Sequence, residues 1–167
     1  IGSCAAILLT KLGPQVAEIT GEHTASGPAA DALDALKVDD GAKAGGYDRD
    51  LFGFRKTDAN NDGCDVREDI LARDLTDVTY KYRGSCIVAA GVLHDPYTGK
   101  TIRFTRGVKT SSAVQIDHVV ALENAWRSGA SAWDAGKRYA FANDPYNLLA
   151  VDGPANQAKG SASAAYW

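Results

Sequence analysis

Five side chains in the C-terminal third of the sequence are of types that could act together on a phosphate ester. Asp117 and His118 stand at the end of one predicted strand, Asn147 opens another, and Asn156 and Lys159 lie on a predicted helix. Phosphodiester hydrolysis needs a base for water, a cation that takes up charge on the phosphate, and a polarised leaving oxygen. The order strand, strand, helix is short enough to bring these five residues around one point.

Asp117 and the side-chain oxygen of Asn156 suit a hard divalent cation, which prefers oxygen ligands. Successive residues of a strand point to opposite faces, so we expect a twist or the end of the strand at His118. Otherwise Asp117 and His118 could not serve one site. A histidine base with an ordinary pKa would give an activity that rises through about pH 6–7.

The pattern along the chain predicts α and β elements in mixed order from Tyr47 onwards. Asp65 can cap a helix, the segment Asp95–Gly99 is a turn that joins two strands into a hairpin, and Gly153–Pro154 opens the last helix. The expected helices cover 66–75, 123–127 and 131–142, and the expected strands cover 78–82, 86–93, 101–105, the start of 114–122, and 147–151.

Residues 1–46 are interpreted as the remnant of an export segment followed by a stalk or linker, with a short helix over 31–38. The apolar run from Ala5 to Leu9 is too short to span a bilayer, and we expect no transmembrane segment in the folded part.

Residues 1–50 carry four basic and eight acidic residues, whereas 51–167 carry fourteen basic and thirteen acidic residues. The net charge of −3 excludes a uniformly basic nucleic-acid binder, but Lys100–Lys109 is a local basic strip without an acidic residue.

Cys64 and Cys86 could close a loop of about 22 residues. The sequence lacks the close Cys pairs of a zinc site, which favours a disulfide, with two buried free thiols as the alternative. A disulfide would imply an oxidising compartment, and hence a secreted or cell-surface protein.

Several segments together resemble a known nuclease family. The segments IDHVVAL (116–122), NLLAV (147–151) and NQAKG (156–160) are similar to the ββα-metal core of HNH nucleases. More specifically, residues 47–167 resemble secreted bacterial HNH-family endonucleases related to the nuclease part of GmrSD-type restriction enzymes. The wider likeness rests on YDRDLFG (47–53), GCDVREDILARDL (63–75), the two cysteines, DPYTG (95–99), QIDHVVALENAW (115–126), FANDPYNLLAVDGPANQAKG (141–160) and the final AAYW.

The resemblance implies a role for each residue of the motif. His118 would be the general base, Asp117 and Asn156 would bind one Mg²⁺ or Mn²⁺, Asn147 would tie the loop that holds His118, and Lys159 would lie near the scissile phosphate. Asn156 stands where the motif name has its last His, which weakens the case for zinc. Family members continue beyond the position of Trp167, so we expect a chain that is truncated relative to them.

Three further interpretations concern residues outside this motif. Arg67 is a candidate for contact with substrate, or for anchoring a carboxylate. Arg138 is a candidate for contact with a phosphate, or for packing of its stem with a pairing to Asp134 four residues earlier. Asp58, Asn60, Asp62 and Asp69 match the ligand positions of a twelve-residue calcium loop, although an Asn/Asp-Gly turn into the helix that Asp65 caps explains the same residues.

The sequence as a whole predicts an α+β domain over 47–167, with an HNH core, a supporting hairpin and one disulfide. We expect a secreted, monomeric, metal-dependent endonuclease that cuts DNA, or RNA as well, with little sequence specificity. The alternative is a non-catalytic secreted module that binds nucleic acid or calcium through a degenerate HNH core.

Overall fold

The computed structural model describes residues 26–28, 31–32, 35, 45–54, 57–163 and 166–167. The chain divides into two compact units, Ile1–Asp39 and Asp40–Trp167, so the expected boundary between residues 46 and 47 lies inside the second unit. In the first unit the N–H of Asp31 donates to the carbonyl of Gly27. Most of the predicted stalk, and most of the helix predicted over 31–38, lie outside the described residues. In the described part of the chain, no helix is long and apolar enough to cross a membrane.

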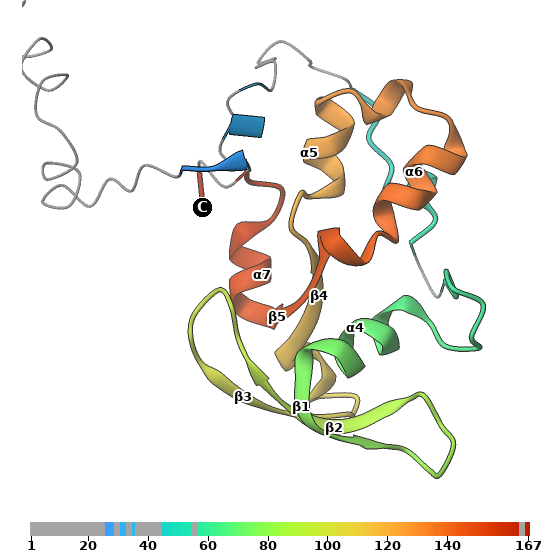
Figure 1. Cartoon of the computed structure of the whole chain (residues 1–167), viewed down its shortest axis with the longest axis vertical. Helices are drawn as coiled ribbons and strands as arrows, with labels where there is room; N and C mark the ends of the chain where they lie inside the picture. Colours follow the sequence, from blue (N-terminus) through green and yellow to red (C-terminus); the bar gives the residue numbers. More distant parts are fainter. Residues whose placement is uncertain (1–25, 29–30, 33–34, 36–44, 55–56, 164–165) are drawn as a thin grey trace, which may run out of the picture. The chain divides into compact units, whose positions relative to one another are not determined.

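The second unit is a mixed α+β fold, as expected, with two small antiparallel sheets (Figure 1). The three-stranded sheet has the order β1 (Leu75–Tyr80), β2 (Val88–His94) and β3 (Thr101–Thr105), and the two-stranded ribbon consists of β4 (Val114–His118) and β5 (Leu148–Asp152). The α-helices are α4 (Val66–Asp74), α5 (Leu122–Arg127), α6 (Ala135–Ala142) and α7 (Gly153–Lys159). Short 3-10 helices cover Arg49–Phe52, Ser111–Ala113, Ala130–Ala132 and Pro145–Asn147.

Helix α4 holds the two sheets together. Asp65 caps it, because its carboxylate accepts the backbone N–H of Glu68 at 3.0 Å. Its apolar face packs into a core with residues from both sheets. The buried members of that core are Val66, Ile70, Leu71, Leu75, Val88, Leu93, Phe104, Val114, Leu148 and Ala150.

A second apolar cluster lies around Phe52 and Trp126, where α5 and α6 meet the first 3-10 helix. The rings of these two residues are 6.2 Å apart, and the indole N–H of Trp126 donates to the carbonyl of Gly45. Both α5 and α6 belong to the connection between β4 and β5, so this cluster fixes how that long connection folds (Figure 1).

The helix predicted over 131–142 is wrong in its bounds. The chain instead forms a 3-10 turn over Ala130–Ala132, and α6 begins after Asp134. The carboxylate of Asp134 accepts the N–H of Lys137 at 2.8 Å, so it caps a new helix and interrupts the expected one. The first strand also differs, because it begins at Leu75, directly after α4.

The basic strip over Lys100–Lys109 is only partly free to bind anions. Arg106 pairs with the buried carboxylate of Glu68 at 2.6 Å and also donates to the carbonyl of Val88 at 2.6 Å. Lys100, Arg103 and Lys109 are exposed. Arg106 therefore serves the fold by joining β2 and β3 to α4.

Cys64 and Cys86 form a disulfide, as the sequence analysis favoured. The bridge joins the segment before α4 to the segment before β2, with a sequence separation of 22. Closing a loop of this length removes conformations from the unfolded chain, a stabilisation of about 3 kcal/mol.

We predict that a Cys64→Ser/Cys86→Ser double variant loses about 3 kcal/mol of unfolding free energy, because its unfolded state is no longer constrained. Denaturant titration followed by circular dichroism, with and without reductant, measures this change. Reductant should destabilise the wild type and leave the double variant unaffected. Equal stability of the two proteins without reductant would show that the bridge does not constrain the unfolded chain.

Candidate active site

The candidate site lies at the end of β4, where the ribbon turns into the long connection that carries α5 and α6. In the ribbon, Asp117 pairs with Leu149 and His118 with Leu148. Asp117 is 6% exposed and His118 is 3% exposed. Burial of two such polar side chains is costly unless each is hydrogen-bonded.

Asp117 is held by two side chains from distant parts of the chain. The hydroxyl of Tyr97, in the β2–β3 turn, donates to Oδ2 at 2.5 Å. The ammonium of Lys159, at the end of α7, lies 2.9 Å from Oδ2 and 3.2 Å from Oδ1. Lys159 is itself 6% exposed and also donates to the backbone carbonyl of His118 at 2.9 Å. The structure thus makes Lys159 the buried counter-ion of Asp117.

Asn156 lies on the same side of β4 as Asp117. Its side-chain N–H donates to Oε1 of Gln115 at 2.9 Å, and Gln115 is two residues before Asp117 on the strand, so the two share a face. On α7, Asn156 and Lys159 are three residues apart and therefore neighbours on the helix surface. Helix α7 thus presents Asn156 to Gln115 and Lys159 to Asp117.

The side-chain oxygens of Asp117 and Asn156, at this face of β4, are of the type that a hard divalent cation prefers. A carboxylate offers about four lone-pair positions. The bonds from Tyr97 and Lys159 use two positions on Oδ2 of Asp117 and one on Oδ1, which leaves one position on Oδ1. The bond from Asn156 to Gln115 uses the amide nitrogen of Asn156, not the oxygen that a cation would need.

His118 is directed to other neighbours than Asp117. Its Nε2 lies 2.9 Å from the carbonyl of Ala142, and its ring meets that of Phe54 edge-on with centroids 4.4 Å apart. A carbonyl can only accept, so Nε2 carries the proton and the lone pair is on Nδ1. Burial lowers the pKa of His118 to about 4, against the opposing effect of the bond to Ala142. His118 is therefore neutral over the physiological pH range.

Asn147 ties the loop that follows His118. Its Oδ1 accepts the N–H of Val120 at 2.8 Å, its Nδ2 donates to the carbonyl of Val120 at 3.3 Å, and its backbone carbonyl accepts the N–H of Val119 at 2.9 Å. These bonds join Asn147, directly before β5, to the two residues that follow His118.

Arg67 and Arg138, the two candidate substrate-binding residues, make hydrogen bonds and ring contacts within the fold. Arg67 donates to the carbonyl of Val114 at 3.0 Å, and burial lowers its pKa. Arg138 donates to the carbonyl of Leu51 at 3.3 Å and lies over the ring of Trp126. These contacts give both arginines a role in packing, and their contact with substrate stays a prediction.

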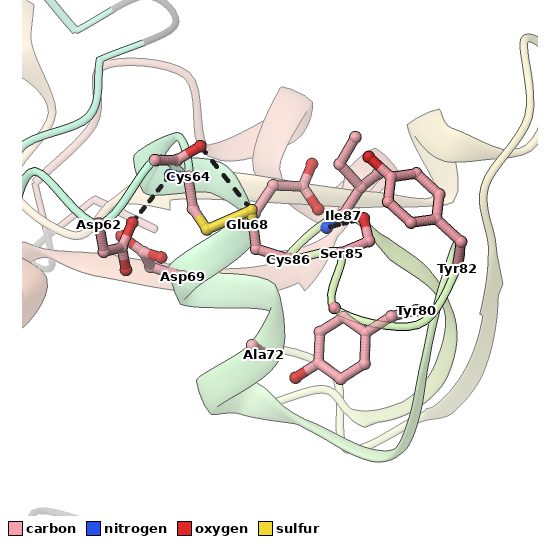
Figure 2. Close-up of a pocket in the computed structure, with 12 residues that line it drawn as sticks. Asp62, Cys64, Glu68, Asp69, Ala72, Tyr80, Tyr82, Ser85, Cys86 and Ile87 are labelled. Carbon is pink, nitrogen blue, oxygen red and sulfur yellow. Dashed lines mark hydrogen bonds between the residues drawn. A yellow bond between two sulfur atoms is a disulfide. The ribbon is translucent and has the colours of Figure 1, made fainter.

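The loop before α4 gathers the four candidate calcium ligands. Asp58 accepts the N–H groups of Asp62 and Gly63, and the amide of Asn60 donates to Asp62 at 2.9 Å and to Asp69 at 3.4 Å. Figure 2 shows Asp62 and Asp69 side by side next to the disulfide. Burial, together with the charges of Asp62 and Asp58, raises the pKa of Asp69. A bound cation would relieve this crowding of negative charge.

Tyr97 is the residue of this site that the sequence analysis missed. It was noted only as part of the DPYTG turn between two strands. The signal was an aromatic residue with a hydroxyl inside a segment shared with the family, but nothing local indicates that the turn folds over Asp117, 20 residues later.

Comparisons with known proteins agree with the resemblance. The family model for the C-terminal domain of GmrSD restriction endonucleases matches residues 65–167. A protein of Arthroderma benhamiae, named an uncharacterized secreted protein, is 40% identical over 137 residues, which are 81% of this chain and 62% of that protein. The chain therefore spans less than two thirds of this relative's length.

No solved structure matches this chain. The family match covers β2, both strands of the ribbon, and α7, and so includes Tyr97, Asp117, His118, Asn147, Asn156 and Lys159, but not Phe54. The chain belongs to the family of the C-terminal domain of GmrSD restriction endonucleases.

Proposed function

We propose that this protein is a metal-dependent HNH-type endonuclease that hydrolyses phosphodiester bonds of DNA, and of RNA as well, with little sequence specificity. The observation that carries the proposal is a buried carboxylate, Asp117, followed directly by a buried neutral imidazole, His118, where β4 ends, with Lys159 of α7 bonded to both residues and Asn156 on the same helix. Membership of a family of restriction endonuclease domains supports a nucleic-acid substrate.

In this mechanism Asp117 and Asn156 would hold one Mg²⁺ or Mn²⁺, which supplies Lewis acidity to the scissile phosphate when bound. His118 accepts a proton from the attacking water at Nδ1, because Nε2 is committed to Ala142. Asn147 keeps His118 in place by fixing the loop after it. Lys159 balances the charge of Asp117 and, through the His118 carbonyl, sets the distance between α7 and β4.

The same proposal includes a location outside the cell and a monomeric state. The disulfide requires an oxidising compartment in which to form and persist, and the similar protein of Arthroderma benhamiae is named as secreted. A nuclease in this location would act on extracellular nucleic acid.

We predict that wild-type protein nicks supercoiled plasmid in Mg²⁺ or Mn²⁺, and that EDTA or His118→Ala abolishes nicking. Loss of a general base should lower the rate by about 10²–10⁴-fold. The matched control is His94→Ala, because His94 is exposed and is the last residue of β2. Plasmid binding without nicking by the wild type, across both metals, would favour the non-catalytic binding module.

The pH dependence of nicking tests the state of His118. The sequence-based expectation of a rise through about pH 6–7 used the ordinary histidine pKa. Burial lowers that pKa to about 4, so the base stays neutral and competent from pH 8 down to pH 5. We predict a rate that holds over this window and falls only as the pH approaches 4.

The control for this profile is circular dichroism at each pH. The pKa of His118 is about 6.5 in the unfolded chain and about 4 in the folded chain. Protonation of His118 therefore favours the unfolded chain, and folding stability also declines below pH 6.5. Rates are compared only where the fold is intact. A rate that halves near pH 6.5 in folded protein would contradict a buried base.

A second proposal is a calcium site in the loop of Asp58, Asn60, Asp62 and Asp69. The raised pKa of Asp69 favours it, because the clustered carboxylates repel one another and a cation would offset this repulsion. The sulfur of Cys64 also lies near Asp62 and Asp69, but it is part of the disulfide and is no thiolate ligand. Oxygen ligands alone suit Ca²⁺.

We predict that Ca²⁺ raises the melting temperature of the wild type and that Asp62→Asn removes this rise. A hundredfold excess over Kd corresponds to about 2.7 kcal/mol of stabilisation. Asp77→Asn is the matched control, since Asp77 is an exposed carboxylate on β1. If Ca²⁺ leaves the melting temperature of the wild type unchanged, the loop is a turn into α4 and no calcium site.

A further inference from the structure

Tyr97 reaches the proposed metal ligand from a sheet that otherwise takes no part in the site. Its hydroxyl donates to Oδ2 of Asp117 at 2.5 Å, and both residues are at least partly buried. Because a carboxylate oxygen can only accept, the hydroxyl of Tyr97 is the donor in this bond.

The turn that carries Tyr97 is fixed to the start of α7. Asp95, which is 2% exposed, accepts the backbone N–H of Thr98 at 2.8 Å with one oxygen and the backbone N–H of Asp152 at 2.9 Å with the other. Asp152 in turn caps α7 by accepting the N–H of Ala155 at 3.0 Å. The turn with Tyr97 and the helix with Lys159 are thus tied to each other independently of Asp117.

The ring of Tyr97 is held as well as its hydroxyl. Trp167 meets it edge-on with ring centroids 4.5 Å apart. A tyrosine whose ring and turn are both fixed loses little freedom when it forms the bond to Asp117. It can therefore hold the carboxylate at one angle.

We propose that Tyr97 is a positioning residue for the metal ligand Asp117, an inference that rests on the proposed function. Tyr97 bonds Oδ2 and Lys159 contacts both oxygens, so the carboxylate is held by two side chains and one lone-pair position of Oδ1 would be left for a cation. Groups that bond a metal-ligating carboxylate in this way orient it and raise metal affinity.

The test is Tyr97→Phe, which removes the hydroxyl and keeps the ring against Trp167. We expect its Kd for Mn²⁺, measured by calorimetry, to be about 10–100-fold weaker than that of the wild type. The Mn²⁺ concentration for half-maximal plasmid nicking should rise by the same factor, and saturating Mn²⁺ should restore most of the rate. A purely structural role would not give this recovery. Tyr82→Phe, which loses the hydroxyl of a 64% exposed tyrosine, is the matched control and should equal the wild type.

The melting temperature in EDTA separates positioning from folding. Loss of one hydrogen bond to a buried carboxylate should lower it by about 5–10 °C and leave the variant folded. Unfolding of the variant in EDTA, or a Kd for Mn²⁺ equal to that of the wild type, would overturn the inference. If the wild type binds Mn²⁺ and nicks plasmid, such a result removes only the role of Tyr97. If the wild type does neither, the proposed function fails, and the role of Tyr97 fails with it.

Discussion

The buried ion pair between Asp117 and Lys159 is the interaction on which the site depends. Both groups are about 94% buried, and the desolvation of two charges is repaid only when further hydrogen bonds satisfy them. Tyr97 and the carbonyl of His118 supply those bonds. Removing either member would leave the other as an uncompensated buried charge, so the pair fixes the distance between β4 and α7.

His118 is also buried, but its side chain is accommodated as a neutral group and not as one member of an ion pair. Its neighbours are the ring of Phe54 and the carbonyl of Ala142, so no carboxylate is bonded to it and the imidazole is neutral. The two side chains have different contacts, and β4 ends at His118, as the sequence analysis expected for residues that serve one site. Lys159 connects the two residues, because it bonds the side chain of one and the backbone of the other.

The two sheets contribute to the site in different ways. The ribbon of β4 and β5 carries Asp117 and His118, whereas the three-stranded sheet contributes Tyr97 from the turn between β2 and β3. The hydrogen bond from the backbone N–H of Asp152 to Asp95 joins that turn to the start of α7. Helix α4 and its core then hold the two sheets at a fixed separation, so the geometry at Asp117 is set by packing throughout the unit.

The sequence by itself determined most of the elements and the residues of the motif. Asp65 caps a helix, Gly153–Pro154 opens another, the Asp95–Gly99 turn joins two strands, and Cys64 lacks any nearby zinc-ligand spacing; each of these signals acts over a few residues of chain. Only the tertiary structure decided that Tyr97 and Lys159 meet on Asp117 and that the histidine pKa is low. Those outcomes depend on which segments pack together and on how much water they exclude, and neither is encoded in any local stretch of sequence.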